Sequence, residues 1–333
     1  MVIRDEAWTR TSRLQPLITT LSRLVRALQT SKTKLSRTEK FARCAALFPV
    51  FGLLVFILRI RATLGKPAIE MVVQTGDGFF FRCGPPDLIQ MYLWLFGVWE
   101  PELTDFINSR LTGGEGFLDV GANIGYFSAL AVRRVGTSGI VIAVEPSPSV
   151  FKLLEETIRL NARGARVRAI NAAAGADIGS VPIYSGPSHN IGLTTTVAER
   201  GFELECVIPS LPLDKLLAPE EIALLRVIKV DVEGREPEVL RGMAELVRDS
   251  RVDLEVLIEL SPNWWADSTL AVTDVLQPFL SAGFNIYEIR NSYWPWRYLW
   301  PRSVARPRRR RSRLPERVDR LDLILSRRDA DFL

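Results

Sequence analysis

The segment Phe117–Gly125 reads FLDVGANIG, a short apolar run followed at once by a glycine-rich turn. Glycine at such a turn lets a ligand approach the backbone where a strand ends and a helix begins. Twenty-four residues after Gly121, a second β-branched run ends in Glu145-Pro146. A carboxylate at that edge of a sheet can accept hydrogen bonds from both hydroxyls of a ribose. Together the two signals predict a nucleotide-type cofactor at the carboxyl edge of a parallel sheet.

Asp119 decides between the two kinds of cofactor that use such a turn. A dinucleotide site has the pattern GxGxxG, whose extra glycine admits a pyrophosphate against the helix N-terminus. Here the turn reads GANIG, and the acid stands two residues before its first glycine. A carboxylate repels a pyrophosphate but attracts the sulfonium and the amino group of S-adenosylmethionine. The sequence therefore favours S-adenosylmethionine and disfavours an NAD-dependent oxidoreductase.

A second acidic motif follows a later apolar strand, in the sequence IKVDVEG at residues 228–234. We expect Asp231 and Glu233 to share one sheet edge with Asp119 and Glu145, because parallel strands end at the same edge. Four carboxylates around one cleft suit a cationic cofactor and a substrate hydroxyl or amine. Asp231 is the first candidate for the base that takes a proton from this substrate hydroxyl or amine, or for the group that orients it.

Glu233 and the loop residue His189, the only histidine, have two interpretations each. Glu233 is either catalytic or structural, as a cap for the helix near Pro237 or as a partner of Arg235 or Lys229. His189 is either the base at neutral pH or a surface residue.

A metal site is the weaker expectation, and we predict none. A divalent cation held by Asp231, Glu233 and Glu259 is the alternative. With one histidine and three widely spaced cysteines, a Cys/His zinc site and a disulfide scaffold are both disfavoured, and a reducing compartment fits best.

Apolar runs and helical patterns alternate along most of the chain, which predicts an α/β fold with a mostly parallel sheet covered on both faces. The last two strands have no helix between them, which indicates an antiparallel edge. The expected strands are 69–74, 78–82, 116–120, 140–144, 167–171, 181–184, 202–207, 225–230, 254–260, 285–289 and 321–325. The expected helices are 87–95, 101–111, 126–135, 149–161, 237–243 and 270–282.

Residues 1–65 form a basic, partly apolar extension, and residues 66–333 form the main domain. Residues 1–43 carry ten Lys/Arg and three acids, a net charge of +7. An amphipathic helix at 17–28 and a polar linker at 30–40 precede the uncharged stretch Cys44–Leu58. Fifteen helical residues reach only about 22 Å, so we expect a docked helix or one in a membrane interface rather than a span.

The loop at 293–313 joins the Trp/Tyr cluster YWPWRYLW to a run with seven arginines and no acid from residue 302 onward. Aromatic rings and arginines suit either a sugar bearing an anionic group or an anionic membrane surface. The total net charge is only +5, so the rest of the chain carries about −9, and no nucleic-acid partner is expected. We expect a cytoplasmic protein attached peripherally to an anionic membrane through 1–61 and 293–313, with these segments on one side of the domain.

Several motifs taken together resemble the FkbM-type methyltransferases: DVGANIGYFSALA, AVEPSPSVFKLLEETIRLN, NAAAG at 171–175, LPLDKLL at 211–217 and IKVDVEGREPEVLRGM. The resemblance covers roughly residues 70–290. It implies a class I methyltransferase, with a Rossmann-like, mostly parallel sheet, that uses S-adenosylmethionine. It also implies that the methionine end lies along Asp119, Gly121, Asn123 and Gly125, the ribose at Glu145 and Pro146, the adenine at Asn171 and Ala172, and the transferring methyl at Asp231.

The function expected from these residues is O-methylation of a hydroxyl on a sugar, a lipid-linked glycan or a natural product. The alternative is a non-catalytic nucleotide-fold scaffold at a membrane surface.

Overall fold

The computed structural model describes residues 15–29, 34–64, 71–84, 87–162, 164–187, 189–300, 306–312, 314–315 and 318–333. The chain forms two compact units. Unit 1 comprises Met1–Trp99 and Tyr293–Arg302, and unit 2 comprises Glu100–Ser292 and Ser303–Leu333. This division differs from the expected boundary at residue 65, because the first hairpin and the aromatic loop both pack with the N-terminal helices.

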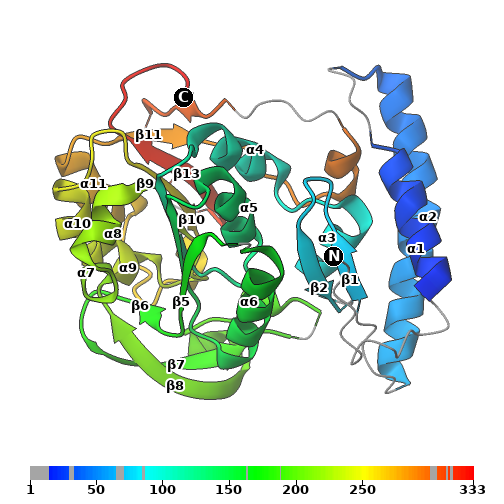
Figure 1. Cartoon of the computed structure of the whole chain (residues 1–333), viewed down its shortest axis with the longest axis horizontal. Coiled ribbons are helices and arrows are strands. Elements are labelled where there is room, and N and C mark those ends of the chain that lie inside the picture. Colours follow the sequence, from blue (N-terminus) through cyan, green and yellow to red (C-terminus); the bar gives the residue numbers. More distant parts are fainter. Residues whose placement is uncertain are drawn as a thin grey trace. The chain divides into compact units, whose positions relative to one another are not determined.

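Unit 2 is built on an eight-stranded sheet with the order β12-β11-β13-β10-β9-β3-β4-β5 (Figure 1). Neighbours from β10 to β5 are parallel, whereas β13 runs antiparallel to both β10 and β11. The strands are β3 (Gly116–Val120), β4 (Ile140–Val144), β5 (Arg166–Ile170), β9 (Leu225–Val230), β10 (Glu255–Leu260), β11 (Asn285–Glu288), β12 (Arg308–Arg309) and β13 (Leu321–Ser326). This is the class I methyltransferase architecture. The expected antiparallel pairing of the last two predicted strands, β11 and β13, is confirmed, although β13 lies between β10 and β11 and β12 forms the edge.

Helices cover both faces of this sheet because its central strands are apolar on both sides. In Figure 1, α5 and α6 lie on one face, and the helices from α7 to α11 lie on the other. Every residue of β3 and β4 is buried. The helices are α4 (Pro101–Arg110), α5 (Tyr126–Val135), α6 (Pro148–Asn161), α7 (Leu213–Leu216), α8 (Pro219–Leu224), α9 (Glu236–Gly242), α10 (Ala244–Arg248) and α11 (Val272–Ser281).

The strand order reverses between β3 and β9, since β4 follows β3 on one side and β9 pairs with its other side. In open α/β sheets a ligand binds at such a switch point, beyond the carboxyl ends of the strands. A small second sheet has the order β6-β8-β7, with β6 (Ala173–Ala174), β7 (Gly179–Ser185) and β8 (Glu203–Leu211).

The arginine-rich run is not the free basic loop that the sequence suggested. Arg308–Arg309 forms the edge strand β12, which pairs with β11. Arg310 lies 2.6 Å from Glu288, Arg311 lies 3.1 Å from Asp331, and Arg309 lies 3.7 Å from Asp329. Glu288 at the end of β11 and two acids that follow β13 therefore pair with three of these arginines.

Unit 1 contains α1 (Gln15–Ala27), α2 (Arg37–Thr63), β1 (Met71–Gln74), β2 (Phe80–Cys83), α3 (Leu88–Phe96) and the 3-10 helix η5 (Pro295–Leu299). The predicted amphipathic helix at 17–28 is confirmed as α1. The Arg26 guanidinium on α1 donates hydrogen bonds to the carbonyl oxygens of Gln74, Leu93 and Trp94. These bonds fasten α1 to the hairpin and to α3.

Helix α2 is longer than the sequence analysis predicted. It has 27 residues and begins inside the expected linker at 30–40. A capping box starts it: the Ser36 hydroxyl accepts a hydrogen bond from the Glu39 N–H, and the Glu39 carboxylate accepts one from the Ser36 N–H. The length argument against a membrane span was therefore wrong, because by length and composition residues Arg37–Leu58 could cross a bilayer.

Much of the aromatic loop packs inside unit 1. The Tyr298 ring lies 4.8 Å from Tyr92 and 4.9 Å from Phe96, and Tyr293 stacks on Trp99 at 5.1 Å. Tyr298 is buried, whereas Trp294 is exposed. The loop therefore divides into a core part and an exposed part.

Candidate active site

Gly121 shapes the turn that follows β3. Its N–H and that of Ala122 both donate to the Val144 carbonyl oxygen, at 2.9 and 3.0 Å. The backbone here has a φ of +78°, and a Cβ would lie only 1.8 Å from the Asp231 carbonyl oxygen. No larger residue fits where the ends of β3 and β9 meet so closely. Asn123 also has a positive φ, of 51°, two residues on.

Glu145 follows β4 and is nearly buried. Its Oε2 accepts a hydrogen bond from the Asn123 N–H, and its Oε1 accepts one from the Ser147 N–H, both at 2.9 Å. Burial raises the pKa of Glu145 to about 7, although these two hydrogen bonds act in the opposite direction. The Asn171 amide donates to the carbonyl oxygens of Glu145 and Pro146, at 2.8 and 3.1 Å. The carboxylate is therefore fixed in place.

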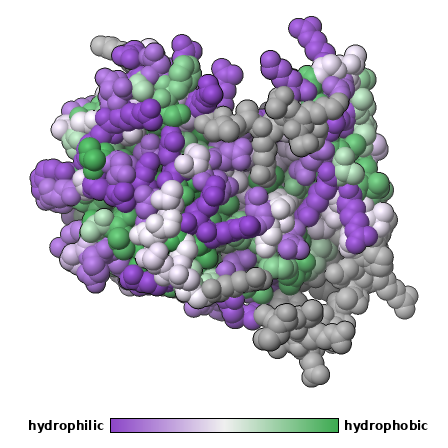
Figure 2. Space-filling view, turned by 45° about the horizontal axis from the view of Figure 1, so that its top comes forward, coloured by the Kyte–Doolittle hydropathy of each residue, from purple (hydrophilic) through white to green (hydrophobic). Residues whose placement is uncertain are grey.

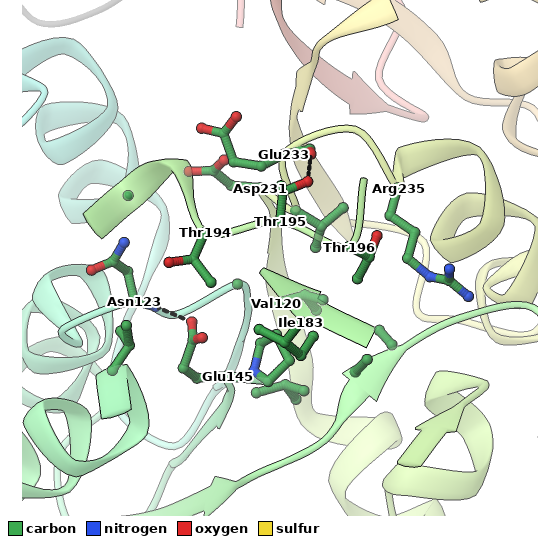
Figure 3. Close-up of a pocket in the computed structure, with 18 of the residues that line it drawn as sticks. Val120, Asn123, Glu145, Ile183, Thr194, Thr195, Thr196, Asp231, Glu233 and Arg235 are labelled. Carbon is green, nitrogen blue, oxygen red and sulfur yellow. Dashed lines mark hydrogen bonds between the residues drawn. The ribbon is translucent and has the colours of Figure 1, made fainter. Parts of the chain in front are cut away.

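A cleft that opens to solvent lies at this edge of the sheet. Figure 3 shows Glu145 and Asn123 at one side of it and the Asp231 and Glu233 carboxylates at the other. The predicted site residues that line the cleft are Gly121, Asn123, Glu145, Pro146, Ala172, Asp231 and Glu233.

Four predicted residues are not part of this lining. Asp119 is buried behind the turn, where its Oδ2 accepts a hydrogen bond from the Ser128 hydroxyl at 2.7 Å. Gly125 starts α5 and packs so close to Leu154 that a Cβ would lie 2.7 Å from its methyl carbon. Asn171 holds the strand end as described above. His189 is exposed in the loop after β7.

Asp119 retains one feature that fits a cationic ligand. Its Oδ1 is buried and has no hydrogen-bond partner among the residues that the structure describes. An unpartnered carboxylate oxygen costs free energy until a donor reaches it. Together with the close approach at Gly121 and the fixed Glu145 carboxylate, it fits a cofactor with an amino group and a ribose.

Asp231 directly follows β9, and its Oδ2 lies 2.8 Å from the Lys229 Nζ. Lys229 is buried, with its ammonium 5.0 Å from the centre of the Phe127 ring. This partner holds the Asp231 carboxylate at the mouth of the cleft.

Glu233 pairs with none of the partners that the sequence suggested. Its carboxylate lies 2.8 Å from Arg200, whose guanidinium covers the Trp264 ring at 4.4 Å. Burial first, and then the neighbouring Asp231, raises the pKa of Glu233. Glu233 does not cap α9, whose N-terminus has no side-chain cap; Glu236, the first residue of that helix, accepts hydrogen bonds from the Gly234 N–H and the Trp265 indole, both at 2.7 Å.

Asp231, Glu233 and Glu259 each offer an oxygen, and these three oxygens lie within 4.8 Å of one another. A divalent cation would find three ligands here. Lys229 and Arg200 already compensate two of the three charges. Three carboxylates so close also favour uptake of a proton, because ionising one raises the energy of ionising the next.

In the loop between β7 and β8, sequence reasoning singled out His189 but missed the residues that line the cleft. The loop residues Ile191, Gly192, Thr194, Thr195 and Thr196 line the cleft. The Thr195 hydroxyl donates to the Glu233 carbonyl oxygen at 2.7 Å, which ties the loop to the end of β9 (Figure 3). The run of three threonines was the one available signal.

A profile of the methyltransferase FkbM domain matches residues 119–286. Hexuronic acid methyltransferase AglP from Haloferax volcanii is 30% identical over 133 residues, which cover 39% of this chain and 50% of that protein. Methyltransferase sdnD from Sordaria araneosa is 28% identical over 156 residues, covering 38% of this chain and 60% of that protein. The chain thus spans about half to three fifths of the length of these relatives.

Among solved structures, fibrillarin from Aeropyrum pernix with bound S-adenosyl-L-methionine matches with a TM-score of 0.35 and 13% identity, over 77% of this chain and 82% of that one. An S-adenosylmethionine-dependent O-methyltransferase from Thermotoga maritima matches with a TM-score of 0.34 and 15% identity, over 81% and 83%. With the family match and the cleft residues together, the cofactor is S-adenosylmethionine.

Proposed function

Because the chain belongs to the FkbM methyltransferase family, we propose that it transfers a methyl group from S-adenosylmethionine to a hydroxyl oxygen, with a sugar hydroxyl as the favoured acceptor. The observation that carries this proposal is the group of three carboxylates, Asp231, Glu233 and Glu259, next to the cofactor cleft.

The chain supplies the contacts that hold the cofactor. Glu145 is placed to accept the ribose hydroxyls, and Ala172 lines the wall expected to face the adenine. Asp119 lies behind the turn and outside the cleft lining, so we assign it an electrostatic role toward the amino group rather than a direct contact. When bound, S-adenosylmethionine supplies a methyl group that is already activated, with a neutral leaving group.

The protein's remaining tasks are to align the acceptor oxygen and to take its proton. We assign the alignment to Asp231, because Lys229 fixes its carboxylate at the cleft mouth. As the O–CH₃ bond forms, the hydroxyl proton passes to Asp231 or to the adjacent Glu233. Glu233 can hold it because its pKa is raised. His189 stays the second candidate base.

The sugar acceptor draws its support from the name of AglP, a hexuronic acid methyltransferase. The hydroxyls of Thr194 and Thr196 at the cleft can exchange hydrogen bonds with a polyhydroxylated acceptor. A lipid-linked glycan and a natural product are acceptors of the same hydroxyl class.

The test is transfer of labelled methyl from S-adenosylmethionine to uronic acids, uronate-containing glycans and simple alcohols. The Asp231→Asn variant should bind S-adenosylhomocysteine almost as well as the parent and lose about 10²–10⁴-fold in turnover. Asp249→Asn, which changes an acid with a 78% exposed side chain, is the matched control and should keep full turnover. Normal turnover by Asp231→Asn would remove Asp231 from the mechanism and direct the search to His189→Gln.

A further inference from the structure

Helix α2 exposes an apolar face along its whole length. Phe41 is 77% exposed, Phe48 64%, Phe56 60% and Leu64 65%. Between them Ala42, Ala45, Ala46, Pro49, Gly52, Leu53 and Ile60 are exposed as well. Among the described residues from Phe41 to Leu64, none of the exposed ones is charged. In Figure 2, hydrophobic residues appear at the right-hand edge of the molecule, where Figure 1 places α2.

The opposite face of α2 is already occupied. Leu47, Leu54 and Leu58 are buried on that side, and the helix contacts α1 and η5. The Arg43 guanidinium donates a hydrogen bond to the Leu28 carbonyl oxygen just beyond α1. These contacts occupy one face of α2 and leave its other sides exposed. This argues against a crossing helix, which would have to carry α1 and η5 into the hydrocarbon.

An aromatic row continues this apolar face. The Phe48 ring lies 6.3 Å from Trp296, which stacks on Trp294 at 4.6 Å. Trp294 is 62% exposed. Tryptophan is enriched where hydrocarbon meets lipid headgroups, because its ring is apolar and its N–H is polar.

Basic residues stand at the ends of the apolar face. Lys34 precedes α2, Arg37 and Lys40 lie in its first turn, and Arg61 lies near its end, with Glu39 as the only acid among residues 34–43. The cations therefore flank the apolar residues along one helix. This arrangement is typical of helices that lie in the plane of an anionic membrane.

We propose that α2 lies in the surface of an anionic lipid bilayer, with Phe41, Phe48, Leu53 and Phe56 among the acyl chains and Trp294 at the headgroups. The apolar face supplies most of the affinity and the flanking cations supply the preference for anionic lipid. The arginines at 309–311 are engaged with acids of their own unit and contribute little.

The experiment is flotation of the full chain with vesicles of phosphatidylcholine, alone or mixed with phosphatidylglycerol, at low and high salt. The parent should float with the mixed vesicles and retain part of its binding at high salt. Replacing Phe41, Phe48 and Phe56 with serine should weaken binding at least about tenfold. The matched control replaces three exposed apolar residues of unit 2, Ile178, Leu204 and Val252, and should float like the parent. Circular dichroism establishes that each variant is folded.

Two outcomes would overturn the proposal directly. In one, the parent does not float with either vesicle. In the other, the serine variant floats as well as the parent. If the parent does not float, its oligomeric state is measured by light scattering. A parent dimer that becomes a monomer on serine substitution would show that a second copy covers this face.

The orientation of α2 is tested by thiol labelling on the vesicles with a membrane-impermeant reagent added outside. With Cys206 replaced by serine, Cys44 reports on the first half of α2; a Thr63→Cys variant in which Cys44 is also replaced by serine reports on its end. Labelling at both positions supports a helix lying along the surface. Protection of one position alone would mean that α2 crosses the bilayer, and would overturn the proposal.

Discussion

At the residue scale, both the fold and the cofactor site depend on the absence of a side chain at Gly121. In Gly121→Ala the new methyl group would overlap the Asp231 carbonyl oxygen, and a positive φ costs a non-glycine residue about 1–2 kcal/mol besides. We expect loss of several kcal/mol of unfolding free energy and no detectable binding of S-adenosylhomocysteine. Gly283→Ala is the matched control, because Gly283 also has a positive φ, of 82°, but faces open space. Urea unfolding measures the unfolding free energy of the two variants, and calorimetry measures their binding of S-adenosylhomocysteine. Similar losses in Gly121→Ala and Gly283→Ala would contradict the proposed close approach.

Glu145 makes cofactor binding depend on pH. Its carboxylate must be ionised to accept both ribose hydroxyls, and burial raises its pKa to about 7. Affinity for S-adenosylhomocysteine should therefore be greatest above this pH and fall as the pH drops below it, by up to about tenfold per pH unit. Glu145→Gln should bind more weakly with a flatter profile. Glu233 and Glu236 also have raised pKa values. If the affinity of Glu145→Gln for S-adenosylhomocysteine depended on pH as that of the parent does, this dependence would be assigned to Glu233 or Glu236.

At the element scale, the loop between β7 and β8 depends on Arg200. This guanidinium donates to the Leu193 carbonyl oxygen, pairs with Glu233 and covers Trp264. In Arg200→Met, we expect faster hydrogen exchange over residues 191–200 and weaker binding of S-adenosylhomocysteine, because the loop lines the cleft. Arg159→Met removes an arginine with a 56% exposed side chain, 3.6 Å from Glu156 on the same helix, and should change neither. Unchanged exchange in Arg200→Met would mean that the threonine contacts alone hold the loop.

The sequence predicted those elements whose formation depends on local pattern. The predicted bounds of β3, β4 and β9 agree with the structure because each is a short, mainly apolar run that ends at a turn. The beginning of α2 was missed although Ser36 and Glu39 form a recognisable capping box. The Arg200–Glu233 pair joins residues 33 apart, and no local pattern marks such a contact. The pairing of β12 was equally hidden, because an arginine run resembles a free basic loop until its acids are known.

At the scale of the whole molecule, the chain consists of two compact units, and only unit 2 contains the cleft. We predict two transitions in calorimetric unfolding. S-adenosylhomocysteine at about 100 times its Kd should stabilise only one of them, by about 2.7 kcal/mol. A single transition that shifts as a whole would show that the units unfold together.

The account's central claim is that the cleft beyond β3, β4 and β9 binds S-adenosylmethionine and not a dinucleotide. Isothermal titration calorimetry of the full chain with S-adenosylhomocysteine and with NAD tests this claim most directly. We predict saturable binding of S-adenosylhomocysteine at one site per chain and no heat of binding with NAD. Binding of NAD, or failure of S-adenosylhomocysteine to bind to the folded chain, would contradict the claim.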